Sequence, residues 1–288
     1  MSRIIKPNQS ELAWEVQTEK LYNKNGHALK DYKLLTRSDS GALLNVCKKS
    51  YNPTLNSRFK EVVQKMSNVT GFEFSGYVEA YGGKKVFAYL KSKGEKMAGF
   101  DFDNYMVIGN SHDYSSGFFI ATVHEMLRCQ NQWSKVTKGS MYTISHTSSL
   151  DYRIEELVLR FENYMEDLRK TKRTLEVWKE IEISPVLREM MIERILNIEL
   201  GNEDALPKRT KSRVESLEFA LDREIRDVGE NLMGLFQGVT YYTTHMLSQK
   251  SNVFGNVLGN AYEVNDKAFS FCSEVESGTI ENFELDLN

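Results

Sequence analysis

The spacing of apolar residues changes near residue 147, and this change constrains the fold more than any other feature. Before it, short apolar stretches are separated by glycine, proline and asparagine, a pattern typical of antiparallel strands. After it, apolar residues recur every three or four positions, as in helices, at Leu150, Ile154, Leu157, Val158, Phe161, Met165, Leu168, Leu175 and Trp178. The sequence therefore predicts an α+β protein: a mainly antiparallel sheet with a packed helix in the N-terminal half, followed by a helical C-terminal half.

The N-terminal half contains about five strands by this pattern. The clearest is a hairpin in which residues 72–81 and 84–90 are joined by Gly82 and Gly83. Two glycines can both adopt the positive φ angles that a two-residue turn requires. The other strands are predicted at residues 42–46, 105–108 and 118–123.

Helices are predicted in both halves. The N-terminal one covers residues 56–67, with Asn56 or Ser57 as its N-cap. A long helix is predicted over residues 149–182, and a second begins at the Ser184-Pro185 pair and ends at Gly201, because proline favours the first helical position. Further helices are predicted near residues 212–226, 230–247 and 255–272, after a Lys/Arg-rich link at 207–213.

These elements suggest four consecutive regions. Residues 1–40 are polar and poorly periodic, and are predicted to form an arm with little structure of its own. Residues 41–147 form the α+β sheet domain, and residues 148–272 form a helical region packed on it. Residues 273–288 form an acidic tail that is expected to be mobile.

Composition excludes several classes of protein. No apolar run among the 288 residues is long enough for a membrane span, and the N-terminus lacks the apolar core of a signal peptide. Three widely separated cysteines favour neither a disulfide framework nor a zinc cluster, which indicates a cytosolic protein. Residues 1–100 hold 17 Lys and Arg against 9 Asp and Glu, a net charge of +8, whereas residues 231–288 hold 2 against 7, a net charge of −5. A basic front suggests a surface that faces a polyanion.

No catalytic motif is present. Residues 82–85 read Gly-Gly-Lys-Lys, but a phosphate-binding loop needs a glycine five residues before the Gly-Lys pair, where Val78 stands. Residues 124–128 read His-Glu-Met-Leu-Arg and lack the second histidine of a zinc protease. We therefore expect a protein that is not an enzyme and that has no cofactor.

Five short segments stand out: Thr36–Gly41 with Tyr51–Asn56, the hairpin from Gly82 to Phe87, Asn110–Ser116 with Arg128–Asn131, Ser145–Thr147, and Thr240–His245 followed by Phe254–Asn256. Together and in this order, they resemble a family of phage and plasmid proteins grouped as a domain of unknown function. The resemblance covers residues 36–272. It implies an origin in a mobile element and no established activity, and it transfers no catalytic residue. The sequence departs from the family pattern at Gln132-Trp133, where a second aromatic or basic residue often follows the Cys-Gln-Asn segment.

Lysines and aromatic residues are interleaved along the predicted sheet. Cations along a groove with aromatic platforms can hold a single strand without reading its sequence. The order of elements is also similar to that of phage single-strand annealing proteins. We therefore expect a phage or plasmid accessory protein of DNA replication or recombination that binds, and anneals, single-stranded DNA as an oligomer in the host cytoplasm. The expected phosphate contacts are Lys48, Lys49, Lys84, Lys85 and Arg128, and the expected stacking residues are Tyr51 and Phe87.

Three alternatives remain open at this point. In the first, the aromatic residues belong to the hydrophobic core, and the lysines lie on a solvated sheet edge and bind nothing. The helical C-terminal half can bind a host protein, and the acidic tail, residues 281–288, can recruit a host or phage replication protein. A metal-dependent nucleic-acid enzyme can be built from His112, Asp113, His124 and His146, although their spacing matches no known metal pattern.

Overall fold

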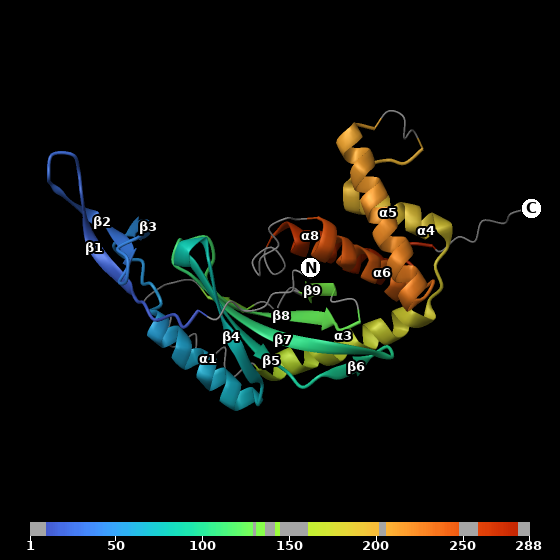
Figure 1. Cartoon of the computed structure of the whole chain (residues 1–288), viewed down its shortest axis with the longest axis horizontal. Coiled ribbons are helices and arrows are strands. Elements are labelled where there is room, and N and C mark those ends of the chain that lie inside the picture. Colours follow the sequence, from blue (N-terminus) through green and yellow to red (C-terminus); the bar gives the residue numbers. More distant parts are fainter. Residues whose placement is uncertain are drawn as a thin grey trace, which may run out of the picture.

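The computed structural model describes residues 10–128, 131–135, 142–144, 161–201, 206–247 and 259–281. A small sheet lies at one end of an elongated molecule, a large sheet lies in the middle, and the C-terminal helices lie at the other end (Figure 1). The predicted α+β class is confirmed. Within the described ranges, no helix is both long enough and apolar enough to cross a membrane.

The small sheet consists of β1 (Val16–Tyr22), β2 (Ala28–Arg37) and β3 (Leu43–Lys48), all antiparallel. The prediction that residues 1–40 have little structure is therefore wrong for the described part of that segment. The strands were missed because most of their residues are exposed on both faces, so the apolar alternation that marks a half-buried strand is absent.

The large sheet has the order β10-β8-β7-β5-β4, with β6 paired to β7 and β9 to β8. Its strands are β4 (Glu73–Ala80), β5 (Lys85–Lys91), β6 (Glu95–Met97), β7 (Phe100–Ser111), β8 (Phe118–Met126), β9 (Asn131–Lys135) and β10 (Tyr142–Ile144). The predicted hairpin is confirmed, but its two-residue turn is wrong. Ala80 pairs with Lys85, which leaves a four-residue connection that includes the short helix η1 (Tyr81–Gly83). Tyr81, Gly82 and Gly83 all have positive φ, at 53°, 69° and 90°.

The helices are α1 (Asn56–Thr70), α3 (Phe161–Glu180), α4 (Pro185–Leu196), α5 (Lys208–Val228), α6 (Leu232–Tyr241), the π-helix η3 (Tyr242–Met246) and α8 (Asn260–Glu276). Ser184 caps α4 and accepts a hydrogen bond from the Leu187 amide, as its position before Pro185 predicts. Three predicted boundaries are wrong. α4 ends at Leu196, before the predicted Gly201, and the basic segment predicted as a link is the first part of α5. α8 extends to Glu276, past the predicted start of the acidic tail.

Two main cores hold the described elements together. The first lies between the small sheet, α1, α3 and one face of the large sheet, with Leu35, Phe59, Val86 and Ile108 among its buried residues. The second is formed by the C-terminal helices and includes Phe102 of the large sheet. The described C-terminal helices therefore contact the large sheet at this residue. A smaller apolar cluster on the other face of the large sheet includes Phe87 and Phe119.

Candidate nucleic-acid interface

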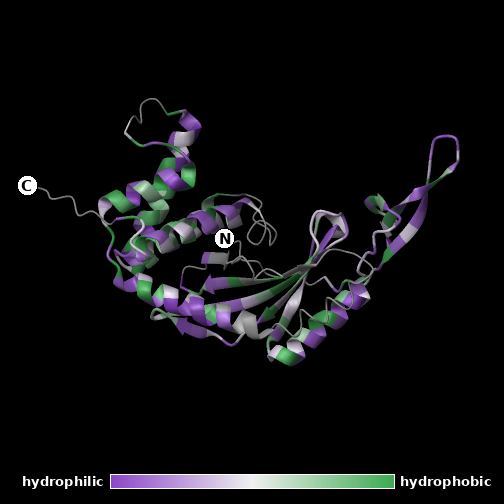
Figure 2. Cartoon of the chain, turned by 180° about the vertical axis from the view of Figure 1, so that it is seen from behind, coloured by the Kyte–Doolittle hydropathy of each residue, from purple (hydrophilic) through white to green (hydrophobic). Residues whose placement is uncertain are grey.

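The small sheet carries a hollow of about 480 Å³. Its lining contains Lys20, Leu29, Lys30, Tyr32, Lys33 and Lys49. The lining includes one acid, Glu19, and its carboxylate accepts a hydrogen bond of 2.5 Å from the Thr36 hydroxyl. The projecting end of the β1–β2 hairpin is hydrophilic (Figure 2). The hollow therefore offers a cationic surface at the end of the molecule.

Tyrosines are exposed on the same sheet. Tyr22 is 55% exposed and Tyr32 is 47% exposed, whereas the aromatic rings of the hydrophobic core are almost fully buried. The strand register pairs Tyr32 with Lys48 and Lys20 with Lys33. Since neighbouring residues of a strand point to opposite faces, these two pairs lie on the two faces of the small sheet. We call this set the small-sheet surface: Lys20, Tyr22, Lys30, Tyr32, Lys33, Lys48 and Lys49. It combines positive charge with aromatic rings that solvent can reach.

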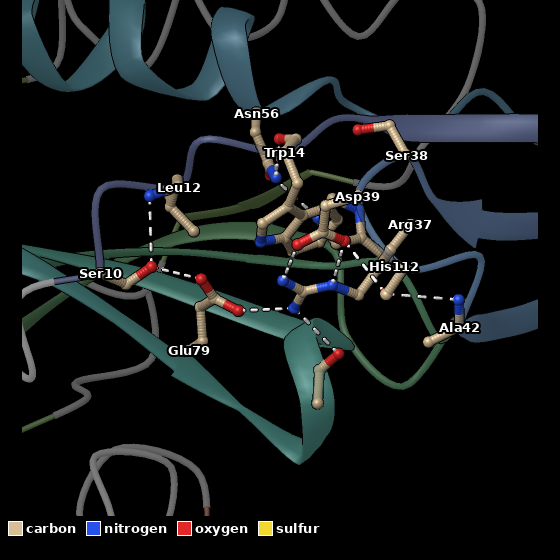
Figure 3. Close-up of polar contacts among 12 residues, drawn as sticks. Ser10, Leu12, Trp14, Arg37, Ser38, Asp39, Ala42, Asn56, Glu79 and His112 are labelled. Carbon is tan, nitrogen blue, oxygen red and sulfur yellow. Dashed lines mark hydrogen bonds and ion pairs between the residues drawn. The ribbon is translucent and has the colours of Figure 1, made fainter.

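Arg37, at the end of β2, fixes the small sheet to the large one (Figure 3). Its Nη1 donates to Glu79 Oε2 on β4 at 2.7 Å and to the Gly82 carbonyl at 3.2 Å. Its Nε and Nη2 donate to the two carboxylate oxygens of Asp39 at 3.0 and 2.8 Å. The guanidinium carbon lies 4.1 Å from the centre of the Trp14 ring. One side chain therefore holds the segment before β1, the loop after β2 and the β4–β5 hairpin together.

The charges around Arg37 are reflected in two pKa values. Hydrogen bonds from Arg37 lower the pKa of Asp39 to about 2. Burial raises the pKa of Glu79, but hydrogen bonds from Ser10 and Arg37 outweigh that effect and hold it below its usual value. Both carboxylates are therefore stabilised in their charged form.

A second set of contacts connects Trp14 to α1 and to the end of β7. The Trp14 carbonyl accepts a hydrogen bond of 2.9 Å from Asn56 Nδ2, and Asn56 Oδ1 lies 3.2 Å from His112 Nε2. The rings of Trp14 and His112 meet edge to face, with their centres 5.7 Å apart. We call the contacts of Trp14, Arg37, Asn56, Glu79 and His112 the joint. It connects the small sheet to α1 and to the large sheet (Figure 3).

The family model named DUF932, a domain of unknown function, matches residues 43–261. The chain belongs to the DUF932 family. The matched region begins at β3 and ends at the start of α8, so it contains the large sheet but not β1 and β2. Neither a curated protein nor a solved structure matches this DUF932 protein.

The sequence-predicted contact residues of this DUF932 protein do not form one groove. Lys48 and Lys49 are exposed on the small-sheet surface. Arg128 is exposed at the other end of the large sheet, where it donates to the Asp227 carbonyl at 2.7 Å. Lys85 is opposite Ser111 at one end of β7, and Asp101, which bonds to the residue before Arg128, is near the other. Ten residue steps of strand separate these two ends by roughly 30 Å.

The two residues expected to stack on bases are buried in the DUF932 fold. Tyr51 is 4% exposed, and its hydroxyl donates to the Ser111 carbonyl at 3.1 Å. Phe87 is 1% exposed and packs edge to face on Phe119. For these two rings the core alternative was the correct one, because a base cannot stack on a ring that solvent does not reach.

Lys84 and Lys85 differ from each other in exposure. Lys84 is half-buried beside the loop that follows β7, and its carbonyl accepts a hydrogen bond of 2.7 Å from the His112 amide. Lys85 is 6% exposed and lies over the Tyr81 ring. Burial lowers the pKa of Lys85, and the nearby charge of Asp113 opposes that shift. Lys85 therefore belongs to the hairpin structure rather than to an open cationic surface.

Sequence reasoning missed five members of the small-sheet surface. All five lie within residues 1–40, the segment that the sequence pattern predicts to be an arm: Lys20, Tyr22, Lys30, Tyr32 and Lys33. A signal was present, because lysine and tyrosine alternate at positions 20, 22 and 24 and again at 30 and 32. A strand that is polar on both faces has no alternation of apolar and polar residues, so its sequence looks like that of a loop.

The histidines of the metal alternative have other partners. His112 contacts Asn56, and His124 Nδ1 lies 2.7 Å from Asn104 Oδ1. In the part of the chain that the structure describes, no three His, Cys, Asp or Glu side chains gather in a metal-binding group. His146 lies outside the described residues.

Proposed function

We propose that this DUF932 protein binds single-stranded DNA through the small-sheet surface. The observation that supports the proposal is the pair of exposed tyrosines, Tyr22 and Tyr32, beside lysines that line an open hollow. Lysines that neutralise phosphates release counterions, which gives affinity and salt dependence. Each tyrosine that stacks on a base contributes about 1–3 kcal/mol, with little dependence on sequence.

The sequence resemblance suggests the process in which this binding activity is used. The resemblance implies an origin in a phage or plasmid, and on that basis we propose an accessory protein of DNA replication or recombination that acts in the host cytoplasm. Strand annealing requires two strands to be brought together, so we propose that the chain acts as an oligomer. The protein is then expected to speed the pairing of complementary oligonucleotides, in addition to binding each strand.

The alternative of a host partner has lost its main support. Amphipathic spacing suggested that the helices expose an apolar face. Leu175 and Trp178 of α3 are instead fully buried in the C-terminal core, and α6 is buried from Leu232 to Thr240. The spacing is therefore explained by packing within the chain.

Fluorescence anisotropy of a labelled 30-mer of deoxythymidine, titrated with protein at several salt concentrations, tests the proposal. The variant Lys33→Ala/Lys49→Ala should lose two phosphate contacts, and the slope of log affinity against log salt should fall by about 1.4. Tyr32→Ala should weaken binding about tenfold, whereas Tyr32→Phe should retain it, because stacking needs the ring and not the hydroxyl.

Lys93→Ala/Lys96→Ala is the matched control. Both lysines are exposed at the far part of the large sheet, and the variant makes the same change in net charge. It should bind with nearly wild-type affinity. If the control and the Lys33/Lys49 variant lose affinity equally, binding depends on net charge alone and the proposed surface is wrong. Absence of binding at low salt would also exclude the proposal.

A further inference from the structure

The first turns of α5 line a second hollow, in the helical half of the chain. Its volume is about 840 Å³, and its walls come from α5, the π-helix η3 and the first residue of α8. Lys208, Arg209 and Arg213 supply positive charge, and Ser212 supplies a hydroxyl group. The Ser216 hydroxyl also lines the hollow, but it donates to the Ser212 carbonyl at 2.7 Å. Among the described residues that line it, none is acidic. The lining is therefore cationic and rich in hydrogen-bond donors.

The side chains of α5 that line this hollow lie on one face of the helix. Arg209, Ser212, Arg213 and Ser216 follow the spacing of three and four residues that brings helical side chains together. Their alignment concentrates two guanidinium groups and the Ser212 hydroxyl along one wall. Guanidinium groups with fixed forks of donors match the oxygens of a phosphate group.

The position of these cations at a helix N-terminus is locally unfavourable. Four of the first six residues of α5 are basic, namely Lys208, Arg209, Lys211 and Arg213. The N-terminal end of a helix carries partial positive charge, so it favours anions and disfavours lysine and arginine. The first turn contains no acidic residue, and the N-cap, Pro207, has no side-chain hydrogen bond to the helix. A bound anion would remove this conflict, and conflicts of this kind are typical of functional sites.

The start of α8 contributes a second helix N-terminus to the same hollow. Asn260, its first residue, is part of the lining, and the N-cap, Gly259, has no side chain to satisfy the first amides. Amides at a helix N-terminus point toward an anion that lies in front of them. The first residues of two helices and three cationic side chains therefore line one hollow.

We propose that this hollow binds a phosphate group, supplied either by the nucleic-acid backbone or by a free nucleotide. The site is separate from the small-sheet surface and does not depend on it. It uses the basic segment 207–213, which the proposed function leaves unexplained.

Calorimetric titration of the full chain with inorganic pyrophosphate at low salt tests the site. Arg209→Ala/Arg213→Ala should weaken binding at least tenfold. Arg173→Ala/Arg226→Ala removes two exposed arginines elsewhere on the helices and should change affinity less than twofold. A wild-type chain that does not bind pyrophosphate, or a double variant that binds it as the control does, would overturn the proposal.

A second variant separates loss of the site from loss of folding. Ser212→Glu places a carboxylate in the hollow and near the N-terminal end of α5, where negative charge stabilises a helix. It should retain or raise thermal stability and should still weaken pyrophosphate binding at least tenfold. Unchanged affinity in this variant would contradict the phosphate site.

The labelled 30-mer distinguishes the two sources of phosphate and the two proposals. If the hollow takes the DNA backbone, Arg209→Ala/Arg213→Ala lowers the salt slope for the 30-mer by about 1.4, in addition to the effect of the small-sheet variant. If it takes a free nucleotide, binding of the 30-mer is unchanged while pyrophosphate binding is lost. Failure of the small-sheet variant to affect the 30-mer would count against the proposed function and leave the phosphate site standing.

Discussion

Arg37 contacts three parts of the molecule at once: the segment that leads into β1, the loop after β2 and the hairpin of β4 and β5. Its guanidinium group can do this because it carries five donors in one plane and stacks on an aromatic face. A lysine has a single charged nitrogen and cannot bond to Asp39 in the same bidentate manner while stacking on Trp14. The residues around Arg37 must leave room for this planar group.

Gly83 provides that room. A Cβ atom at this position would lie 2.5 Å from Arg37 Nη1 and 2.6 Å from a Trp14 ring carbon, and the φ angle is +90°. We expect Gly83→Ala to destabilise the protein by about 3 kcal/mol in denaturant unfolding, from backbone strain together with overlap. Gly82→Ala is the control, because its φ is +69° but its Cβ would contact nothing within 4 Å. It should cost only the backbone strain, about 1 kcal/mol. Equal costs would mean that the joint tolerates the added atom.

The charge of Glu79 makes the joint sensitive to acid. Its pKa is below the usual value in the folded protein, so it contributes stability above its unfolded pKa of about 4.3, which is lost as pH falls through the folded value. We expect Glu79→Gln to be less stable than wild type at pH 7 and to lose less stability between pH 5 and pH 2, as measured by thermal unfolding. Glu73→Gln, on the same strand but exposed, should follow the wild-type profile. A wild-type profile for Glu79→Gln would show that the ion pair adds nothing to folding.

At the scale of elements, α1 is capped from outside itself. Glu15, in the segment before β1, accepts hydrogen bonds of 2.7 Å from the amides of Asn56 and Ser57. The predicted caps, Asn56 or Ser57, are wrong, because Leu55 is the N-cap residue and makes no side-chain bond to the helix. A residue about 40 positions away in the chain replaces the local cap, which no local pattern reveals.

Removing this cap should destabilise α1. We expect Glu15→Ala to lower the free energy of unfolding by about 1–2 kcal/mol, because two amides lose an acceptor and the helix end loses a favourable charge. Glu11→Ala, at a nearby exposed position, should change stability by less than 0.5 kcal/mol. Circular dichroism during urea titration measures both. An unchanged urea midpoint for Glu15→Ala would mean that water accepts the hydrogen bonds of the two amides as well as the Glu15 carboxylate does.

The elements that could be predicted are those in which apolar residues repeat at regular spacing because one face of the strand or helix is buried. Ser184-Pro185 marks the start of α4 because its chemistry is local, and the β4–β5 hairpin is recognisable because its strands are apolar. β1 and β2 could not be recognised, because their side chains are largely exposed. The same reason hid Tyr22 and Tyr32, so the candidate surface lay where sequence patterns carry least information. Phe87 was misassigned because an aromatic residue beside lysines can belong to the core as readily as to a binding surface.

At the scale of the whole molecule, two cores divide the described chain. Leu35 of the small sheet shares a core with α1 and one face of the large sheet. Leu235 of α6 lies in the core of the C-terminal helices. The small sheet is thus part of the larger fold, and its stability depends on the large sheet.

Hydrogen exchange should separate these cores. Leu35→Ala, which removes a fully buried side chain, should cost about 2–5 kcal/mol and speed exchange in β2, α1 and β5 more than in α5 and α6. Leu235→Ala should show the opposite distribution. Mass spectrometry of peptides from both variants measures the contrast. Uniform acceleration in both variants would mean that the cores unfold together.

The family model begins at residue 43, the first residue of β3, the third strand of the small sheet. Trp14, Glu15 and Arg37 therefore precede the region that defines the family, whereas Asn56, Glu79 and His112 lie within it. In a chain with only the matched region, β3 would lack β2, the strand with which it pairs here. The unpaired edge of β3 would then need to be covered by some other segment. In this chain the family model therefore covers one half of the joint, and the polypeptide before the matched region supplies the other half together with β1 and β2, so that preceding segment decides what most of the small sheet presents to solvent.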